Sequence, residues 1–300
     1  MRKDMHTEPA APVIVGIDGS PASESAALWA AQEAARRNVE LRLIYVVNSV
    51  LGQSIPAESY RVDVEKAKTV LAAVRRQVVS TIPEARVKTD FYEGNPAGVL
   101  VAESRFASLI CLGTNGIGRF VKAFLGSTAE TVAGDAACSV ALIRTADATK
   151  TADFHPQFIV APVSVYADDS RIIRAAVRRA RHHHSPVLAL GVKDNDLGAT
   201  PRDVLDQMVD RWRQEYPDVT WYPVATNAGL PHFLRDHPEL AVTVVLNSTG
   251  KLDISSVIGG IHREPVVMNQ LVVFIDRDHD ETESRTDRTA ASTGDQTVPQ

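Results

Sequence analysis

The stretch "PVIVGIDGSPASESAALWAAQEAARRNVELRLIYVV", residues 12–47, contains a strand pattern, a helix pattern and a second strand pattern in succession. Its first seven residues form an apolar run that is typical of a strand buried on both faces. Ser20 is a suitable helix N-cap with Pro21 at the first helical position, and the Ala-rich sequence behind them has high helix propensity. Residues 40–47 are again typical of a strand, so the stretch predicts a β-α-β unit.

The same alternation continues as far as residue 145. Between residues 59 and 82, apolar residues are spaced by three or four positions, which predicts a long amphipathic helix. Asn95 and Pro96 repeat the arrangement of a cap followed by proline and so predict a further helix. The remaining predicted elements are strands at 85–94, 108–113 and 139–144 and a short helix at 127–136. This order predicts a parallel, doubly wound sheet covered by helices on both faces.

The pattern of the first stretch recurs at residues 158–192, "FIVAPVSVYADDSRIIRAAVRRARHHHSPVLALGV". With an offset of 145 positions, Ile159 falls on Ile14. The later segments recur in the same order and end in an apolar strand, "QLVVFIDR", at 270–277. We therefore predict an internal duplication, with two copies of one five-stranded α/β domain joined near residues 146–157.

The domain boundaries follow from this duplication and from the composition of the two ends. The tail is polar and rich in Ser, Thr and Asp, with almost no large apolar residue, so it cannot offset the entropy of ordering. We expect a disordered N-terminus at 1–11, a first domain at 12–146, a second domain at 155–277 and a disordered tail at 278–300.

The overall composition excludes several function classes. The formal net charge is −5, so no field favours non-specific binding of nucleic acid or of an anionic membrane. The N-terminal residues lack the apolar core of a signal peptide, and no apolar run reaches the length of a membrane span, which predicts a cytoplasmic protein. Cys111 and Cys138 lie inside apolar runs, which favours buried thiols over a disulfide.

A glycine-rich stretch, "GTNGIGRFVKAFLGST" at 113–128, follows the predicted fourth strand. In open parallel sheets, ligands bind beyond the carboxyl ends of the strands where the strand order reverses, usually between the first and fourth strands. A helix that begins near Ser127 would offer free backbone N–H groups to an anion, and Gly126 would allow close approach of a phosphate. Asp18, at the end of the first strand, could accept from a ribose hydroxyl or an exocyclic amine. A nucleotide site is one interpretation, and a plain structural turn is the other.

Two common phosphate motifs do not fit. A Walker A loop needs a lysine between glycine and Ser/Thr, whereas Gly126 directly precedes Ser127, and Lys122 lies four residues too early. The dinucleotide fingerprint G-x-G-x-x-G should follow the first strand, where "GIDGSP" does not supply it. Asp18 also has a structural interpretation, as a cap at the entry to the first helix.

The stretch "GTNG-IGRFVKAFL-GST" resembles Gly-x2-Gly-x9-Gly-(Ser/Thr), the nucleotide motif of the ATP-binding universal stress proteins. "VIVGIDGSPAS" is similar to the opening strand of that family with its aspartate, and "EGNPAGVLVAES" to its Gly-x-Pro segment. The resemblance covers residues 12–145, and the second copy extends it to 277. It implies two tandem five-stranded parallel-sheet domains, Rossmann-like and of the adenine nucleotide alpha hydrolase-like type, that form an intramolecular pseudo-dimer.

The resemblance also implies a role for each matching residue of the first domain. The ligand would be ATP or a related adenine nucleotide, with Mg²⁺ admissible beside the phosphates. In this assignment Gly16 and Asp18 face adenine and ribose, Val46 packs on adenine, Gly113 lies beside the ribose, and Gly116, Gly126, Ser127 and Thr128 hold the phosphates. Ser139 stands where many members of the family have proline, which should not affect the pocket.

The second copy departs from the motif. At the offset of 145 positions Val163 replaces the aspartate, and in the glycine motif of the second copy Asn247 stands for the first glycine. Gly250 is kept, but Gly260 is followed by Ile261 in place of Ser or Thr. A carboxylate and a hydroxyl are therefore lost from the second site. We expect the second domain to keep the fold without binding ATP strongly, which gives one nucleotide per chain.

Other conspicuous residues have structural interpretations. The run His182–His184 is predicted to be a solvated helix terminus, because adjacent histidines point in different directions, and no metal site is expected there. The acids at 168–169 suit the start of a helix. Trp212, Trp221 and Tyr222 are expected to pack in the core or between the domains.

These features favour a stress-response binding module whose first domain takes up an adenine nucleotide and signals its occupancy. The resemblance implies that the final strands, 139–144 and 270–277, pair the two domains, with further homodimerisation left open. No nucleic acid, membrane partner or catalytic residue is expected. The alternatives are a slow ATP-hydrolysing or adenylating enzyme of the same fold and a nucleotide-free interaction scaffold.

Overall fold

The computed structural model describes residues 10–48, 57–114, 126–145, 154–165, 168–192, 200–227, 229–247 and 270–277. The two segments expected to be disordered lie outside these residues, apart from residues 10 and 11. Gly116, Lys122, Gly250, Gly260 and Ile261 also lie outside them.

Strands and helices alternate along both halves of the chain. The first half contains β1 (Val13–Ile17), α1 (Pro21–Arg37), β2 (Leu41–Val47), α2 (Ala57–Thr81), β3 (Val87–Glu93), α3 (Pro96–Glu103), a 3-10 turn at Ser104–Phe106, β4 (Leu109–Gly113), α4 (Ser127–Asp135) and β5 (Ser139–Thr145). The second half contains β6 (Phe158–Val163), α5 (Ser170–His183), β7 (Val187–Gly191), α6 (Arg202–Glu215), β8 (Trp221–Ala225), α7 (Leu230–Asp236), β9 (Ala241–Asn247) and β10 (Gln270–Asp276).

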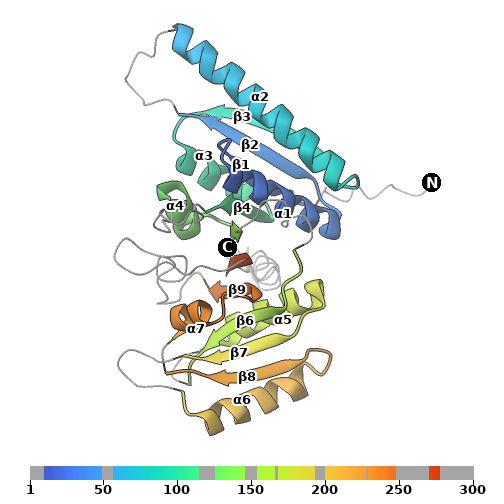
Figure 1. Ribbon diagram of the computed structural model, residues 1–300, viewed down its shortest axis with the longest axis vertical. Coiled ribbons are helices and arrows are strands. Elements are labelled where there is room, and N and C mark those ends of the chain that lie inside the picture. Colours follow the sequence, from blue (N-terminus) through green and yellow to red (C-terminus); the bar gives the residue numbers. More distant parts are fainter. Residues whose placement is uncertain are drawn as a thin grey trace, which may run out of the picture.

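The ten strands within the described residues form one sheet, in the order β3-β2-β1-β4-β5-β10-β9-β6-β7-β8. Each half contributes five parallel strands, and β1 lies between β2 and β4 as a doubly wound domain requires. β5 and β10 pair antiparallel at the centre and join the two halves (Figure 1). This confirms the predicted fold and the predicted pairing of the two final strands.

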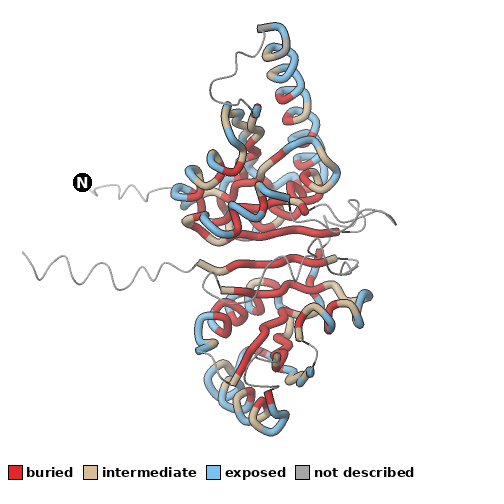
Figure 2. The backbone as a smooth tube through the Cα atoms, turned by 90° about the vertical axis from the view of Figure 1, so that its left-hand side faces the viewer, coloured by how far each residue is buried: buried red, intermediate tan, exposed pale blue. Residues whose placement is uncertain are grey.

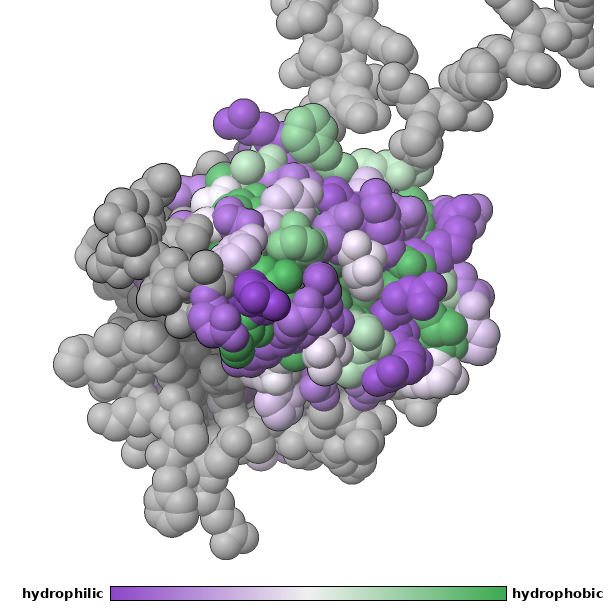
Figure 3. Space-filling model, turned by 90° about the horizontal axis from the view of Figure 1, so that it is seen from above, coloured by the Kyte–Doolittle hydropathy of each residue, from purple (hydrophilic) through white to green (hydrophobic). Residues whose placement is uncertain are grey.

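The central pairing removes the edge that each half would otherwise expose. In Figure 2 the strands that meet at the waist of the molecule are buried, whereas the outer turns of the helices are exposed. The edges that remain are β3 and β8. At the β3 end, seen from above in Figure 3, hydrophilic side chains are interspersed with apolar ones. This mixture is typical of a solvated surface.

Helices cover both faces of the sheet. On one face, α1 and α2 pack on the first half, and α5 and α6 pack on the second. On the other face, α3, α4 and α7 belong to one apolar cluster that runs across both halves and includes Ile14, Leu142, Leu230 and Val273. The two halves therefore share a core on the α4 face and meet through α1 and α5 on the opposite face.

The helix boundaries confirm the capping predictions. The Ser20 hydroxyl accepts a hydrogen bond from the Ser23 N–H (3.2 Å), and Asn95 caps α3 in the same way. α1 and α5 both end at a residue in the left-handed conformation, Asn38 (φ 55°) and His184 (φ 54°). The long helix predicted for 59–82 is α2.

The structure corrects the alignment of the two copies by one residue. Val13 faces the α1 side of the sheet, and Ile159 faces the equivalent α5 side, whereas Ile14 faces the opposite side. The offset in this region is therefore 146 positions, because a shift of one residue along a strand moves every side chain to the other face. Ser164, and not Val163, then occupies the position of Asp18.

The predicted buried residues are mostly confirmed. Both thiols are free and buried, and burial raises the pKa of Cys111 well above its ordinary value. Trp221 is buried and lies against Trp212, with ring centroids 5.5 Å apart. Tyr222 is 49% exposed on β8 at the outer edge of the sheet, so its prediction as a core or interdomain residue was wrong.

Candidate functional site

Three of the predicted site residues lie at the carboxyl ends of neighbouring strands. Gly16 is in β1, Asp18 directly follows it, and Val46 is in β2, which pairs with β1. Gly16 faces Leu112 and Leu100, and Val46 packs on the apolar cluster that contains α3 and α4. Gly16 and Val46 therefore share the face of the sheet that carries α4.

Asp18 is held in the loop between β1 and α1. Its Oδ1 accepts a hydrogen bond from the Ser20 N–H at 2.9 Å, and its own N–H lies 3.4 Å from the Ser23 hydroxyl. Burial would raise the pKa of Asp18, but the hydrogen bonds from Ser20 and Ser23 outweigh it and lower the pKa. The carboxylate is thus ionised at neutral pH. It also has the helix-entry role that the sequence offered as an alternative.

Gly113 ends β4 against the first turn of α1. A Cβ at this position would lie 2.2 Å from the Ala22 carbonyl oxygen and 2.8 Å from the Ser23 nitrogen, distances that no side chain can occupy. The glycine is therefore required by the packing of β4 on the α1 backbone. Sequence reasoning gave it a place beside a ribose and missed this structural reason.

The N-terminus of α4 supplies the other predicted residues. Gly126 is the N-cap, with extended backbone (φ −64°, ψ 149°) and without a side-chain cap hydrogen bond. Among the described residues, none would lie within 4 Å of a Cβ on Gly126, so this part of the chain leaves the first turn accessible. Gly126 and Ser127 are exposed, and Thr128 is half-buried. Free N–H groups in a first turn, beside two hydroxyls, can bind an anion.

The equivalent edge of the second half is built differently. Ser164 stands at the position of Asp18, and its N–H donates to Asp169 Oδ2 at 2.6 Å. A carboxylate is therefore still present near this edge, but on another element. Burial raises the pKa of Asp169 to about 6. Asp169 is the N-cap of α5 and Asp168 accepts from the Ser170 N–H, so both acids lie at the helix start as predicted.

Asn247 occupies the position of Gly113, as predicted. The matching strand registers, Ile110 against Ile14 and Val244 against Val160, fix this equivalence. α5 begins at the position that corresponds to residue 24 of the first half, about one turn later than α1. A side chain at the end of β9 and a full first helical turn would compete for the same space.

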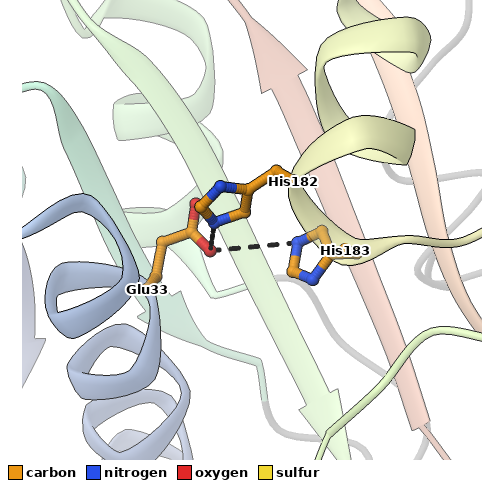
Figure 4. A group of neighbouring side chains, drawn as sticks. All are labelled: Glu33, His182 and His183. Atoms are coloured by element: carbon orange, nitrogen blue, oxygen red, sulfur yellow. Dashed lines mark hydrogen bonds and ion pairs between the residues drawn. The ribbon is translucent and has the colours of Figure 1, made fainter.

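A charged cluster between the halves was missed by sequence reasoning. Glu33 of α1 is fully buried, and its Oε1 accepts from both Nη atoms of Arg179 (2.7 and 2.6 Å) and from Arg37 (2.9 and 2.6 Å). Its Oε2 lies 3.1 Å from His182 Nε2 and 3.8 Å from His183 Nε2 (Figure 4). His183 is buried, so the prediction of a solvated histidine terminus was wrong for this residue.

The composition of this cluster resembles a metal site, since ligand atoms of Glu33, His182 and His183 lie within 4.8 Å of one another. The surrounding charges favour a different role. Arg179 Nη1 lies 3.5 Å from His183 Nε2, and Arg36 Nη1 lies 3.3 Å from its Nδ1. A divalent cation would face these guanidiniums as well as Arg37, with one carboxylate to balance them. The cluster is an ion-pair network that joins α1 to α5.

A separate open groove of about 380 Å³ lies between α2 and β3. Its lining combines cationic and apolar side chains with one threonine: Lys68, Leu71, Ala72, Arg75, Arg76, Thr89 and Phe91. The groove shares no residue with the predicted nucleotide site at the carboxyl ends of the strands.

None of the helices within the described residues is long and apolar enough to cross a membrane.

Comparison with known proteins agrees with this geometry. The model of the family described as "Universal stress protein family" matches residues 10–144. The universal stress protein Rv2624c of Mycobacterium tuberculosis is 35% identical over 235 residues, which cover 78% of this chain and 84% of that protein. Rv3134c of the same organism is 33% identical over 221 residues, covering 70% of this chain and 78% of that protein.

A solved structure also matches both halves. The crystal structure of a universal stress protein from Archaeoglobus fulgidus aligns with a TM-score of 0.65 and covers 91% of this chain and 98% of its own. Its identity is 19%, so it supports the fold alone. The mycobacterial relatives, in contrast, are similar to this chain in sequence over most of its length. The chain belongs to the universal stress protein family.

Proposed function

We propose that the first half, residues 12–146, binds ATP or a related adenine nucleotide and acts as a regulatory module. The observation that carries the proposal is the combination of an ionised carboxylate at the end of β1 with the N-terminus of α4, which follows β4 at the same carboxyl edge of the sheet and has no side-chain cap hydrogen bond. Asp18 and Gly16 are assigned to the nucleoside and Val46 to adenine. Gly126, Ser127 and Thr128, with Gly116 outside the described residues, are assigned to the phosphates. Mg²⁺ would accompany the phosphates.

Gly113 is assigned to the ribose, which its backbone would contact. Because it lets β4 approach α1 closely, it also brings the strand end next to the loop that holds Asp18. Its role in the proposed site is therefore to set the distance between two walls of the pocket.

We propose that the second half, residues 155–277, does not bind the nucleotide. Ser164 and Asn247 stand in place of Asp18 and Gly113, and the nearby carboxylate of Asp169 is engaged by a backbone N–H. The expected stoichiometry is one nucleotide per chain. A slow hydrolase or adenylating enzyme remains the alternative function, but none of the residues assigned to the phosphates carries a carboxylate or an imidazole that could act as a general base.

Calorimetric titration with ATP tests the proposal. Asp18→Ala should weaken ATP by about tenfold or more, since a hydrogen bond to a charged group is lost. The matched control is Ser164→Ala at the equivalent position of the second half, which should leave affinity unchanged. Two equal sites per chain would contradict the assignment of the second half. An absence of ATP binding would contradict the whole proposal and favour a scaffold.

A further inference from the structure

The C-terminus of α4 is held by an arginine from the other half of the chain. Arg277, directly after β10, donates through its guanidinium to the carbonyl oxygens of Ala133, Gly134 and Ala136, with a distance of 2.7 Å to Gly134. Its backbone N–H also donates to the Ser139 hydroxyl at 3.1 Å. These carbonyls are the last acceptors of α4, which intrahelical hydrogen bonds leave free.

α4 cannot supply this contact itself. Its last turn carries no basic residue and ends on Asp135, whose negative charge is unfavourable at the negative end of a helix dipole. α1, in contrast, has Arg36 and Arg37 in its own last turn and a left-handed cap at Asn38. The short phosphate-facing helix of the first half therefore depends on the second half for its C-terminal cation.

We propose that Arg277 is a positioning residue for the nucleotide site, through which the second half regulates phosphate binding by the first. The inference rests on the proposed function, because it assigns the N-terminus of α4 to the phosphates. A nine-residue helix spans about 13 Å, so Arg277 acts through the helix without touching the ligand. By fixing the C-terminal end, it holds the first turn, with its free N–H groups, in the geometry that a phosphate requires.

The coupling is reciprocal. A phosphate that orders the first turn of α4 also orders its last turn, and so strengthens the contact with Arg277. The residues of the tail follow Arg277 directly in the sequence. Nucleotide binding in the first half would thus change the contact that Arg277 makes at the end of β10. The second half, without a nucleotide of its own, would serve as the responding partner.

The test compares ATP with adenosine in full-length Arg277→Met. Because α4 acts on phosphates, ATP should bind about three- to tenfold more weakly, whereas adenosine affinity should not change. Arg277→Lys, which keeps the charge, should restore part of the loss. The matched control is Arg178→Met, since Arg178 pairs with Asp276 at 2.9 Å beside the same strand end but belongs to α5, which lies on the opposite face of the sheet from α4. Hydrogen exchange of α4 amides should slow with ATP in the wild type and less in Arg277→Met.

The outcomes separate the two proposals. Equal weakening of ATP and adenosine would show that Arg277 merely supports the fold, and unchanged ATP affinity would show no coupling; either result overturns the inference while the nucleotide site stands. If the wild-type chain binds no ATP, the proposed function fails and the inference fails with it. A loss confined to ATP, partly restored by lysine, supports the inference.

Discussion

The two halves share one fold, yet they differ at equivalent positions in ways that a symmetric dimer could not. Residue 33 of α1 corresponds to residue 179 of α5, since the buried positions of the two helices match at an offset of 146. One is glutamate and the other arginine, and they pair with each other across the junction. In a dimer of identical domains this position would meet its own copy and repel it. Duplication within one chain therefore allows complementary charges at the approximate two-fold axis that relates the two halves.

The strand pairing locates the same axis. Ala141 of β5 lies opposite Phe274 of β10, and these two residues are themselves equivalent by the registers of β4–β5 and β9–β10. Arg179 lies over the Phe274 ring, 4.2 Å from its centroid. The ion pair, the aromatic ring and the central strand pair thus lie together where the two halves meet.

The largest effect on stability should come from placing the same residue, glutamate, at both of these equivalent positions. Arg179→Glu would leave two buried carboxylates in place of an ion pair and should lower the free energy of unfolding by about 3–5 kcal/mol. The measurement is the urea midpoint of the full-length chain. The double variant Glu33→Met with Arg179→Met should lose much less than Arg179→Glu, because no uncompensated charge stays buried. An unchanged midpoint in Arg179→Glu would contradict the role of this pair.

The next effect concerns the strand end that differs between the halves. Gly113→Asn introduces at the end of β4 the residue that β9 has at the equivalent position, Asn247. The new Cβ would lie 2.2 Å from the Ala22 carbonyl oxygen, so the first turn of α1 would have to move away. We expect a loss of about 3 kcal/mol in unfolding free energy, together with loss of ATP binding. The control is Gly134→Ala in α4, where a Cβ meets nothing within 4 Å and stability should be kept or rise. An unchanged free energy of unfolding in Gly113→Asn would contradict this expectation, because it would show that the first turn of α1 can move away without loss of stability.

A pH dependence distinguishes the last turns of α1 and α5, where Arg37 corresponds to His183. Burial lowers the pKa of His183 to about 3, the Glu33 charge opposes the shift, and Arg179 adds to it. Between this value and the ordinary 6.5 the unfolded chain binds more protons, so stability falls as the pH drops through 6.5. From pH 7 to pH 5 the loss should be about 2 kcal/mol.

Urea unfolding of wild type and His183→Gln at both pH values measures this effect. The variant should lose about 2 kcal/mol less than the wild type over the same interval. Glu33 does not interfere, because its pKa lies well below 4.5 and its contribution is lost at lower pH. An identical pH dependence in the two proteins would show that folding does not lower the pKa of His183.

The smallest effect is expected in β9, where Thr243 takes the position of Leu109. Thr243 is fully buried, and within the described part of the chain its hydroxyl has no hydrogen-bond partner. Thr243→Val should raise the free energy of unfolding by about 1 kcal/mol, because an unsatisfied polar group is removed at constant shape. Thermal unfolding measures it. A lower melting temperature would mean that the hydroxyl is satisfied by water.

The sequence by itself determined the fold class, the duplication and the helix caps. These features depend on local patterns, namely apolar periodicity and cap residues before proline. The pairing of the final strands was implied by the family resemblance, and the apolar composition of both strands agrees with it. It also selected Asp18 and the glycine stretch at 113–128 through the spacing of their motif. Comparison with relatives confirmed the family.

Only the tertiary structure decided the register between the two copies, because a one-residue shift between apolar strands changes which face each side chain meets without changing composition. It alone identified the contact partners at the junction: Glu33 with Arg179, His183 inside the network, and Arg277 on α4. The partners in these contacts are 143 to 147 positions apart and belong to no sequence motif. Their roles arise from the antiparallel meeting of β5 and β10, which brings distant helix ends together.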